Sequence, residues 1–317
     1  MRPSFDATAT RARLWQLLGD VPPLFTPQVT RTRYATRDTY SIDHLTFDNG
    51  AGAMVTGYLL LPHHLTAPTA AVLYHHIHGN KYDLGKAMMI DPQRNRNGIA
   101  DGVELVKAGF IVLGIDAYAF GERQHQGAAG KRESGAATEL TLFKQFLWAG
   151  KTLWGMMVRD DLLALAYLRS LPAVDPRRIG TTGMSLGGSR ATWVAALDGQ
   201  LALVVPIAQM TRYADFAETG AYHQHSIYYY VPGMLTSGID MEHIVCLAHP
   251  ARQIILIGDR DPLSPLTGVH KIAHFTTRYY RYQGDARGCQ VKIYPDCAHT
   301  YTPAMHHDMR QAFIDHL

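Results

Sequence analysis

Short apolar runs alternate along the chain with longer amphipathic segments, which predicts strands and helices in alternation. Residues 41–47 alternate in polarity, as an edge strand with one solvated face does, whereas residues 254–257 are continuously apolar and predict a strand buried on both faces. The expected strands cover residues 41–47, 54–61, 70–74, 110–115, 179–182, 201–207, 253–257 and 290–294, and the expected helices cover 99–108, 158–170, 186–197, 269–282 and 305–317. This order predicts an α/β fold with a mostly parallel central sheet of about eight strands, antiparallel at its start and covered by helices.

Two long segments interrupt the alternation. Residues 120–157 carry a Gly/Ala/Gln-rich loop and an aromatic run, and residues 211–245 are rich in tyrosine. Because insertions after parallel strands gather over the carboxyl end of the sheet, we expect both to form lid-like walls of a substrate pocket. The wall candidates are Tyr118, Phe146, Trp148, Tyr229 and Tyr230. In the alternative interpretation, these aromatic side chains fill a second small core or a subunit interface.

Composition limits the classes of protein that fit. The 317 residues are 47% hydrophobic and 18% charged, contain no repeat or Pro/Ser-rich linker, and predict a single domain over 1–317 with an N-terminal extension at 1–39. No apolar run is long enough to cross a membrane, and residues 1–20 do not have the pattern of a signal peptide. We therefore expect a cytoplasmic protein without a membrane partner.

Charge and cysteine content remove two further classes. The net charge is only +3 and no block of lysine or arginine occurs, which speaks against nucleic-acid binding. The spacing of Cys246, Cys289 and Cys297 matches neither a disulfide framework nor a zinc site, so three free thiols are expected.

The strongest chemical signal is the pentapeptide at residues 183–187, Gly-Met-Ser-Leu-Gly, between an expected strand and an expected helix. In this setting a G-x-S-x-G motif presents its serine on a strained turn at the end of the strand, with the amino end of a helix beside it. Side chains in place of Gly183 and Gly187 would collide with the neighbouring strand or helix. The motif predicts Ser185 as a nucleophile, with the N–H of Leu186 as one donor to a developing oxyanion.

A serine nucleophile needs a base, and the base needs an acid that orients it. Asp261 follows the apolar strand at 253–257 and precedes a proline that holds it extended, which favours it as the acid; Asp259 is the alternative. His299 lies between the last strand and the last helix, where the base belongs. His306 and His307 fall inside that helix and are expected at the surface.

The second oxyanion donor is expected in the loop after the third strand, which contains three histidines and a glycine. A main-chain N–H of Ile77 or His78 is the candidate. His76 and His78 alternate as metal ligands do, but no carboxylate or cysteine lies near them in the sequence. We expect neither a metal nor a cofactor.

These segments together resemble the α/β-hydrolase superfamily and, within it, the dienelactone-hydrolase-like and acetyl-xylan-esterase-like branch. The resemblance covers about residues 40–317, and the matching segments are 75–79 with Lys86, 114–123, 175–180, the serine motif and 258–265. It implies an α/β-hydrolase fold with Ser185 as nucleophile, Asp261 as acid, His299 as base, and backbone donors at Leu186 and within residues 76–79. Dienelactone hydrolases carry cysteine at the nucleophile position, so the serine favours an ordinary esterase.

The expected function is hydrolysis of a small-molecule carboxylic ester with a small acyl group, through an acyl-enzyme. A peptidase of the prolyl-oligopeptidase type shares the order Ser, Asp, His, but such enzymes generally carry a large additional domain. A non-catalytic binding protein on the same fold is the alternative from another class. The sequence also leaves a homo-oligomer open.

Overall fold

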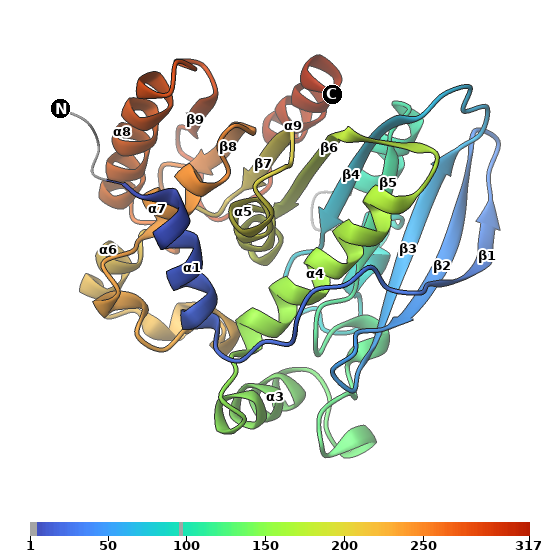
Figure 1. Cartoon of the computed structure of the whole chain (residues 1–317), viewed down its shortest axis with the longest axis horizontal. Helices are drawn as coiled ribbons and strands as arrows, with labels where there is room; N and C mark the ends of the chain where they lie inside the picture. Colours follow the sequence, from blue (N-terminus) through green and yellow to red (C-terminus); the bar gives the residue numbers. More distant parts are fainter. Residues whose placement is uncertain (1–4, 95–97) are drawn as a thin grey trace.

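The central sheet decides where every candidate residue lies. The computed structural model describes residues 5–94 and 98–317, and in this part of the chain nine strands form one sheet in the order β1-β2-β3-β5-β4-β6-β7-β8-β9 (Figure 1). Strands β1, β2, β3 and β5 pair in antiparallel fashion, whereas β5, β4, β6, β7, β8 and β9 are parallel neighbours. The strands are β1 (Thr30–Thr36), β2 (Tyr40–Asp48), β3 (Met54–Pro62), β4 (Thr69–His75), β5 (Ile111–Ile115), β6 (Val174–Met184), β7 (Leu203–Ile207), β8 (Arg252–Gly258) and β9 (Cys289–Tyr294).

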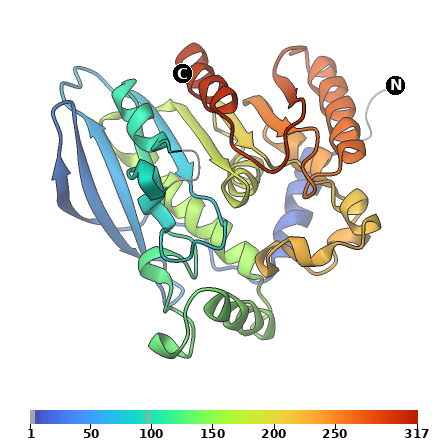
Figure 2. The same ribbon diagram turned by 180° about the vertical axis from the view of Figure 1, so that it is seen from behind.

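Helices cover both faces of this sheet and create two hydrophobic cores. One core is shared by side chains of the sheet with α1, α4, α5, α7 and α8, and the other by the opposite face with α2 and α9. Figure 1 shows α1, α4 and α5 in front of the sheet, and Figure 2 shows α9 on the reverse side. These helices are α1 (Ala7–Leu18), α2 (Asp101–Lys107), α4 (Leu153–Ser170), α5 (Leu186–Asp198), α7 (Met241–Leu247), α8 (Leu266–Tyr282) and α9 (Pro303–His316).

The α/β-hydrolase fold predicted from the sequence is confirmed, and all eight expected strands belong to the sheet. The ninth, β1, was missed because its sequence, Thr-Arg-Thr-Arg-Tyr-Ala-Thr, is exposed at six of seven positions and carries no apolar alternation. The N-terminal extension also contains α1, whose Leu14 and Leu18 are fully buried in the first core.

The two insertions lie together at one edge of the molecule (Figure 2). The first contains α3 (Ala136–Trp148), and the second contains α6 (Tyr213–Glu218) and short 3₁₀ turns at Tyr222–Gln224 and Ile227–Tyr229. Ser226 of the second insertion donates a hydrogen bond to Glu139 on α3, which joins the two segments directly. In the part of the chain that the structure describes, no helix is both long and apolar enough to span a membrane.

Candidate active site

Ser185 is the single residue between the end of β6 and the start of α5. Its backbone has φ 56° and ψ −116°, a conformation that residues other than glycine rarely adopt. The N–H of Ser185 donates to the carbonyl oxygen of Ile207 on β7 over 2.8 Å, which helps to hold the strained turn. The serine side chain is therefore fixed at the carboxyl end of the parallel strands.

The glycines of this turn are required by close backbone approach. A Cβ at Gly183 would lie 2.4 Å from the carbonyl oxygen of His75, and a Cβ at Gly187 would lie 2.2 Å from the same atom. The collision predicted from the sequence therefore takes place against the end of β4. This contact brings the amino end of α5 against the loop that follows β4.

His299 lies between Ser185 and Asp261. Its Nε2 is 2.9 Å from Ser185 Oγ, and its Nδ1 is 2.8 Å from Asp261 Oδ2. The other carboxylate oxygen of Asp261 accepts the N–H of Leu263 over 2.9 Å, and the carboxylate is fully buried. Asp259, the alternative acid, instead accepts the N–H of Cys297. The structure thus brings together the three residues predicted as nucleophile, base and acid.

The acid and base loops meet because β8 and β9 are neighbours in the sheet. The N–H of Arg260 donates to the carbonyl oxygen of Cys297 over 2.9 Å, and a Cβ at Gly258 would lie 2.1 Å from that oxygen. Farther along, His307 is exposed as expected, but the prediction for His306 is wrong. Its side chain is largely buried, with Nδ1 2.9 Å from a carboxylate oxygen of Asp101 on α2.

The expected oxyanion donors lie in two segments: Leu186 follows the serine directly, and His78 lines the same cavity as the serine. Leu186 is the first residue of α5, so its N–H has no acceptor within the helix. In the loop after β4, Nε2 of His76 accepts the N–H of Ala117 over 3.0 Å, so the ring proton is on Nδ1, which donates to the carbonyl oxygen of Ile77 over 2.8 Å. Burial also lowers the pKa of His76 well below its usual range. The neutral ring therefore fixes the peptide unit that carries the N–H of His78.

Ser185 and His299 line a cavity of about 470 Å³. The loop after β4 contributes His78 and Tyr82, α3 contributes Glu139, and the second insertion contributes His225 and Tyr228, among other residues. Both insertions thus form walls of this cavity. Most of the side chains that face it are polar, which suits a ligand with hydrogen-bonding groups.

Four of the predicted wall residues lie elsewhere. Tyr229 and Tyr230 line a separate cavity of about 330 Å³ within the second insertion. The ring of Tyr229 stacks on the ring of His225, with the ring centroids 4.3 Å apart. Phe146 packs against Tyr118, with ring centroids 5.4 Å apart, and does not reach the serine cavity. Trp148 is 95% exposed at the end of α3. These predictions are wrong because the aromatic rings support the insertions from behind or face solvent.

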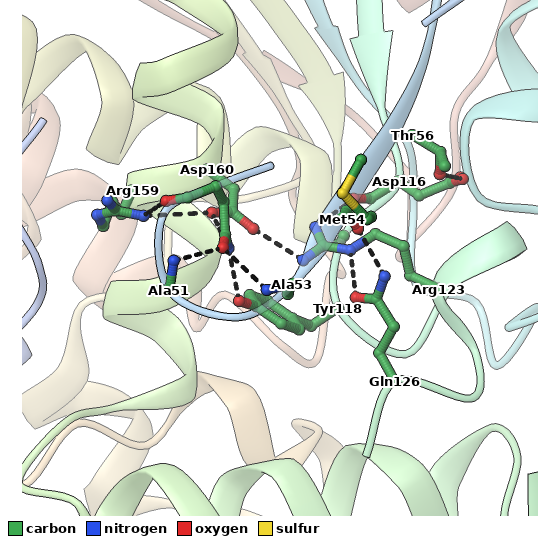
Figure 3. Close-up of polar contacts among 12 residues, drawn as sticks. Ala51, Ala53, Met54, Thr56, Asp116, Tyr118, Arg123, Gln126, Arg159 and Asp160 are labelled. Carbon is green, nitrogen blue, oxygen red and sulfur yellow. Dashed lines mark hydrogen bonds and ion pairs between the residues drawn. The ribbon is translucent and has the colours of Figure 1, made fainter. Parts of the chain in front are cut away.

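Tyr118 belongs to a buried ionic network instead of the cavity wall (Figure 3). The guanidinium of Arg123 lies 3.9 Å from the centre of its ring, and Asn49 donates to its hydroxyl oxygen over 2.9 Å. Arg123 also donates to Asp160 on α4 over 2.8 Å. The network anchors the start of the first insertion to the longest helix of the core.

The histidines at the end of β4 and in the loop after it have protein partners. Besides the contacts of His76, His78 pairs with Glu139, and His75 Nε2 lies 3.0 Å from the hydroxyl of Thr181. Within residues 5–94 and 98–317, no group of three or more His, Cys, Asp or Glu side chains is arranged to hold a metal ion.

Comparison with known proteins identifies the family. The acetyl xylan esterase (AXE1) family matches residues 29–232, more than half of the chain. The chain belongs to the acetyl xylan esterase family. It is a carboxylic ester hydrolase. A Bacillus subtilis (strain 168) protein named "Putative hydrolase YtaP" is 34% identical over 298 residues, which span 94% of this chain and 95% of the relative.

Solved structures support the fold of this esterase. A "putative acetyl xylan esterase" from Bacteroides fragilis NCTC 9343 has a TM-score of 0.73 at 17% identity, covering 91% of this chain and 74% of its own. Acetyl xylan esterase 1 from Thermoanaerobacterium sp. JW/SL YS485 has a TM-score of 0.66 at 17% identity, covering 99% of this chain and 94% of its own.

Sequence reasoning did not select several side chains that line the cavity of this esterase, among them Tyr82, Glu139 and His225. Glu139 approaches His78 from 61 residues away along the chain, and His225 approaches Leu263 from 38 residues away. No local motif signals such contacts. The Gly/Ala/Gln-rich loop and the tyrosine-rich run located the insertions but did not indicate which side chains face the serine.

Proposed function

We propose that the chain is a serine esterase that cleaves carboxylic esters of small acyl groups through an acyl-enzyme. The observation that carries the proposal is the continuous hydrogen-bonded chain from Ser185 Oγ through His299 to the buried carboxylate of Asp261. A serine hydroxyl is a weak nucleophile at neutral pH unless a base accepts its proton, and the position of His299 suits that role.

In the proposed mechanism, Ser185 Oγ attacks the ester carbonyl carbon while its proton passes to His299 Nε2. The resulting imidazolium is stabilised by Asp261, and the tetrahedral oxyanion accepts hydrogen bonds from the N–H of Leu186 and from the loop that contains Ile77 and His78. His299 then gives the proton to the departing alcohol oxygen, which leaves an acyl group on the serine. Water, activated by the same histidine, releases the acid and restores the serine.

Two other functions fit less of what is known of the chain. A prolyl-oligopeptidase-type peptidase shares the residue order, but the family that matches residues 29–232 is one of acetyl xylan esterases. A non-catalytic binding protein does not need the strained backbone of Ser185, which is retained at a cost of about 1–3 kcal/mol. Ester hydrolysis does use this strained turn, because the turn presents the hydroxyl of Ser185 to His299.

A substrate panel tests the proposal. The panel contains acetyl, propionyl and octanoyl p-nitrophenyl esters, acetylated sugars, a lactone and a prolyl peptide. Each compound is assayed with wild type, with Ser185→Ala and with the control Ser189→Ala, one turn farther along α5. Ser185→Ala lowers kcat on esters by about 10⁴-fold or more, whereas the control retains activity. If Ser185→Ala keeps more than about a tenth of the wild-type activity, or if only the peptide is cleaved, the proposal is wrong.

Two expectations from the sequence remain predictions. The cytoplasmic location is tested by cell fractionation, and a homo-oligomer is tested by light scattering of the purified protein.

A further inference from the structure

The wall of the serine cavity contains a carboxylate that the proposed mechanism does not use. Glu139 on α3 has an exposed fraction of only 2%, and three side chains approach its two oxygens. His78 Nε2 lies 3.2 Å away and the hydroxyl of Tyr82 lies 2.9 Å away, while the hydroxyl of Ser226 also donates to the carboxylate. Each of these three groups can donate a hydrogen bond, and a carboxylate oxygen accepts it.

The partners of Glu139 satisfy its oxygens without supplying a positive charge. The N–H of Asn80 donates to Nδ1 of His78 over 3.1 Å, so this nitrogen carries no proton and the ring is neutral, with its proton on Nε2. Tyr82 and Ser226 contribute only neutral hydroxyl groups. The negative charge of Glu139 therefore has no counter-ion among these contacts.

The rest of the cavity does not supply one either. Among the described residues that line it, there is no lysine or arginine, and its other titratable groups besides Tyr82 and Tyr228 are histidines. Burial lowers the pKa of His225 to about 4, which keeps that ring neutral at pH 7. Burial and the nearby charge of Glu139 raise the pKa of Tyr82, so its hydroxyl stays protonated. Among the described lining residues, Glu139 is therefore the only carboxylate, and no lysine or arginine of the lining offsets its charge.

We propose that Glu139 is a specificity-determining residue whose charge makes the cavity favour esters that carry a cationic ammonium group and reject esters that carry a carboxylate. The proposal rests on the proposed esterase function. In a cavity of about 470 Å³, a bound ligand lies within roughly 10 Å of the Glu139 carboxylate. At that distance and an effective dielectric constant of about 20, two unit charges interact strongly enough to change binding roughly tenfold.

Three acetates of similar shape separate charge from size. These are acetylcholine, its uncharged carbon analogue 3,3-dimethylbutyl acetate, and 4-acetoxybutanoate. We expect wild type to show a kcat/KM at least about tenfold higher for the cation than for the anion, with the neutral ester between them. This ratio falls as salt rises, because salt screens charges across the open mouth of the cavity.

Glu139→Gln keeps the shape of the side chain and removes its charge. The cation-to-anion ratio then falls at least about tenfold, and kcat/KM for the neutral acetate, measured beside it, separates this change of ratio from a general change of activity. The matched control is Glu133→Gln, in the same insertion but outside the cavity lining, where Glu133 accepts a hydrogen bond from Thr141 over 2.7 Å. The control keeps the wild-type ratio.

Two results would overturn the proposal: a ratio unchanged by Glu139→Gln, or an anion hydrolysed as fast as the cation by wild type. If Glu139→Gln does not fold, the salt dependence in wild type decides, and a salt-independent ratio overturns the proposal. If wild type hydrolyses none of these acetates or the p-nitrophenyl esters, the esterase function itself fails.

Discussion

Asp261→Asn changes one atom in the proposed triad and tests the role of the acid. In the native protein, one carboxylate oxygen of Asp261 accepts the N–H of Leu263 and the other accepts Nδ1–H of His299. The oxygen of the new amide can still accept the N–H of Leu263, but the NH₂ group of the amide then points toward His299. Nδ1 must then be the acceptor, which puts the ring proton on Nε2, where it blocks transfer from Ser185.

The magnitude follows from these contacts. Turning the amide over restores the correct tautomer but leaves the buried N–H of Leu263 facing a second donor, which costs about 1–3 kcal/mol. The imidazolium also loses a carboxylate at an effective charge separation of about 4 Å, worth about 4 kcal/mol at an effective dielectric constant of about 20. At about 1.4 kcal/mol per factor of ten, the sum predicts a loss in kcat of about 10⁴-fold.

The assay is steady-state hydrolysis of p-nitrophenyl acetate, with thermal unfolding to verify that each variant is folded. Asp259→Asn is the matched control, since Asp259 contacts the N–H of Cys297 and not His299. We expect this control to keep most of the wild-type kcat. If Asp261→Asn retains more than about a tenth of the activity, or if Asp259→Asn is the more damaging change, the assignment of the acid is refuted.

Three further outcomes are expected. Arg190→Met removes a guanidinium 2.6 Å from Asp161 and, among the described side chains, leaves that buried carboxylate with only the ring of His75, 3.4 Å away. The loss of the ion pair lowers the free energy of unfolding by about 3–5 kcal/mol in urea denaturation, and a loss below about 1 kcal/mol contradicts this. Burial lowers the pKa of His225 to about 4, below the value of about 6.5 in the unfolded chain, so the stability from its neutral ring is complete above pH 6.5 and is lost as pH falls toward 4. His225→Gln should flatten the fall in unfolding free energy over this range, and an unchanged profile would count against the effect. Acetyl and propionyl p-nitrophenyl esters should have a kcat/KM at least about tenfold higher than the octanoyl ester, because a long alkyl chain would lie against the polar cavity wall; activity that rises steadily with chain length would refute this.

The catalytic loops could be predicted because each follows a strand with a clear sequence signal. Runs of β-branched or apolar residues located β6, β8 and β9. The G-x-S-x-G motif after β6 then selected Ser185, and the loops after β8 and β9, taken in chain order, selected Asp261 and His299. The parallel order of these strands then brings their carboxyl ends to one edge of the sheet. Strand β1 escaped because its exposed positions carry no hydrophobic pattern.

The cavity walls could not be predicted because they depend on how the insertions pack. Glu139 and Trp148 lie on the same helix, and at about 100° per residue their nine-residue separation puts them on opposite faces. Aromatic content favoured Trp148, but the face that turns toward Ser185 is the one where Glu139 meets His78 and Ser226. That choice is made by contacts between distant segments, which no local pattern records.

The most direct test of the account is to trap the nucleophile. Wild type, Ser185→Ala and the control Ser189→Ala are treated with a fluorophosphonate, and the intact mass and the modified peptide are determined by mass spectrometry. We predict one adduct per chain on Ser185 in wild type and in the control, with loss of esterase activity in parallel, and no adduct in Ser185→Ala. An adduct on another residue, or equal labelling of Ser185→Ala, would contradict the proposed acyl-enzyme.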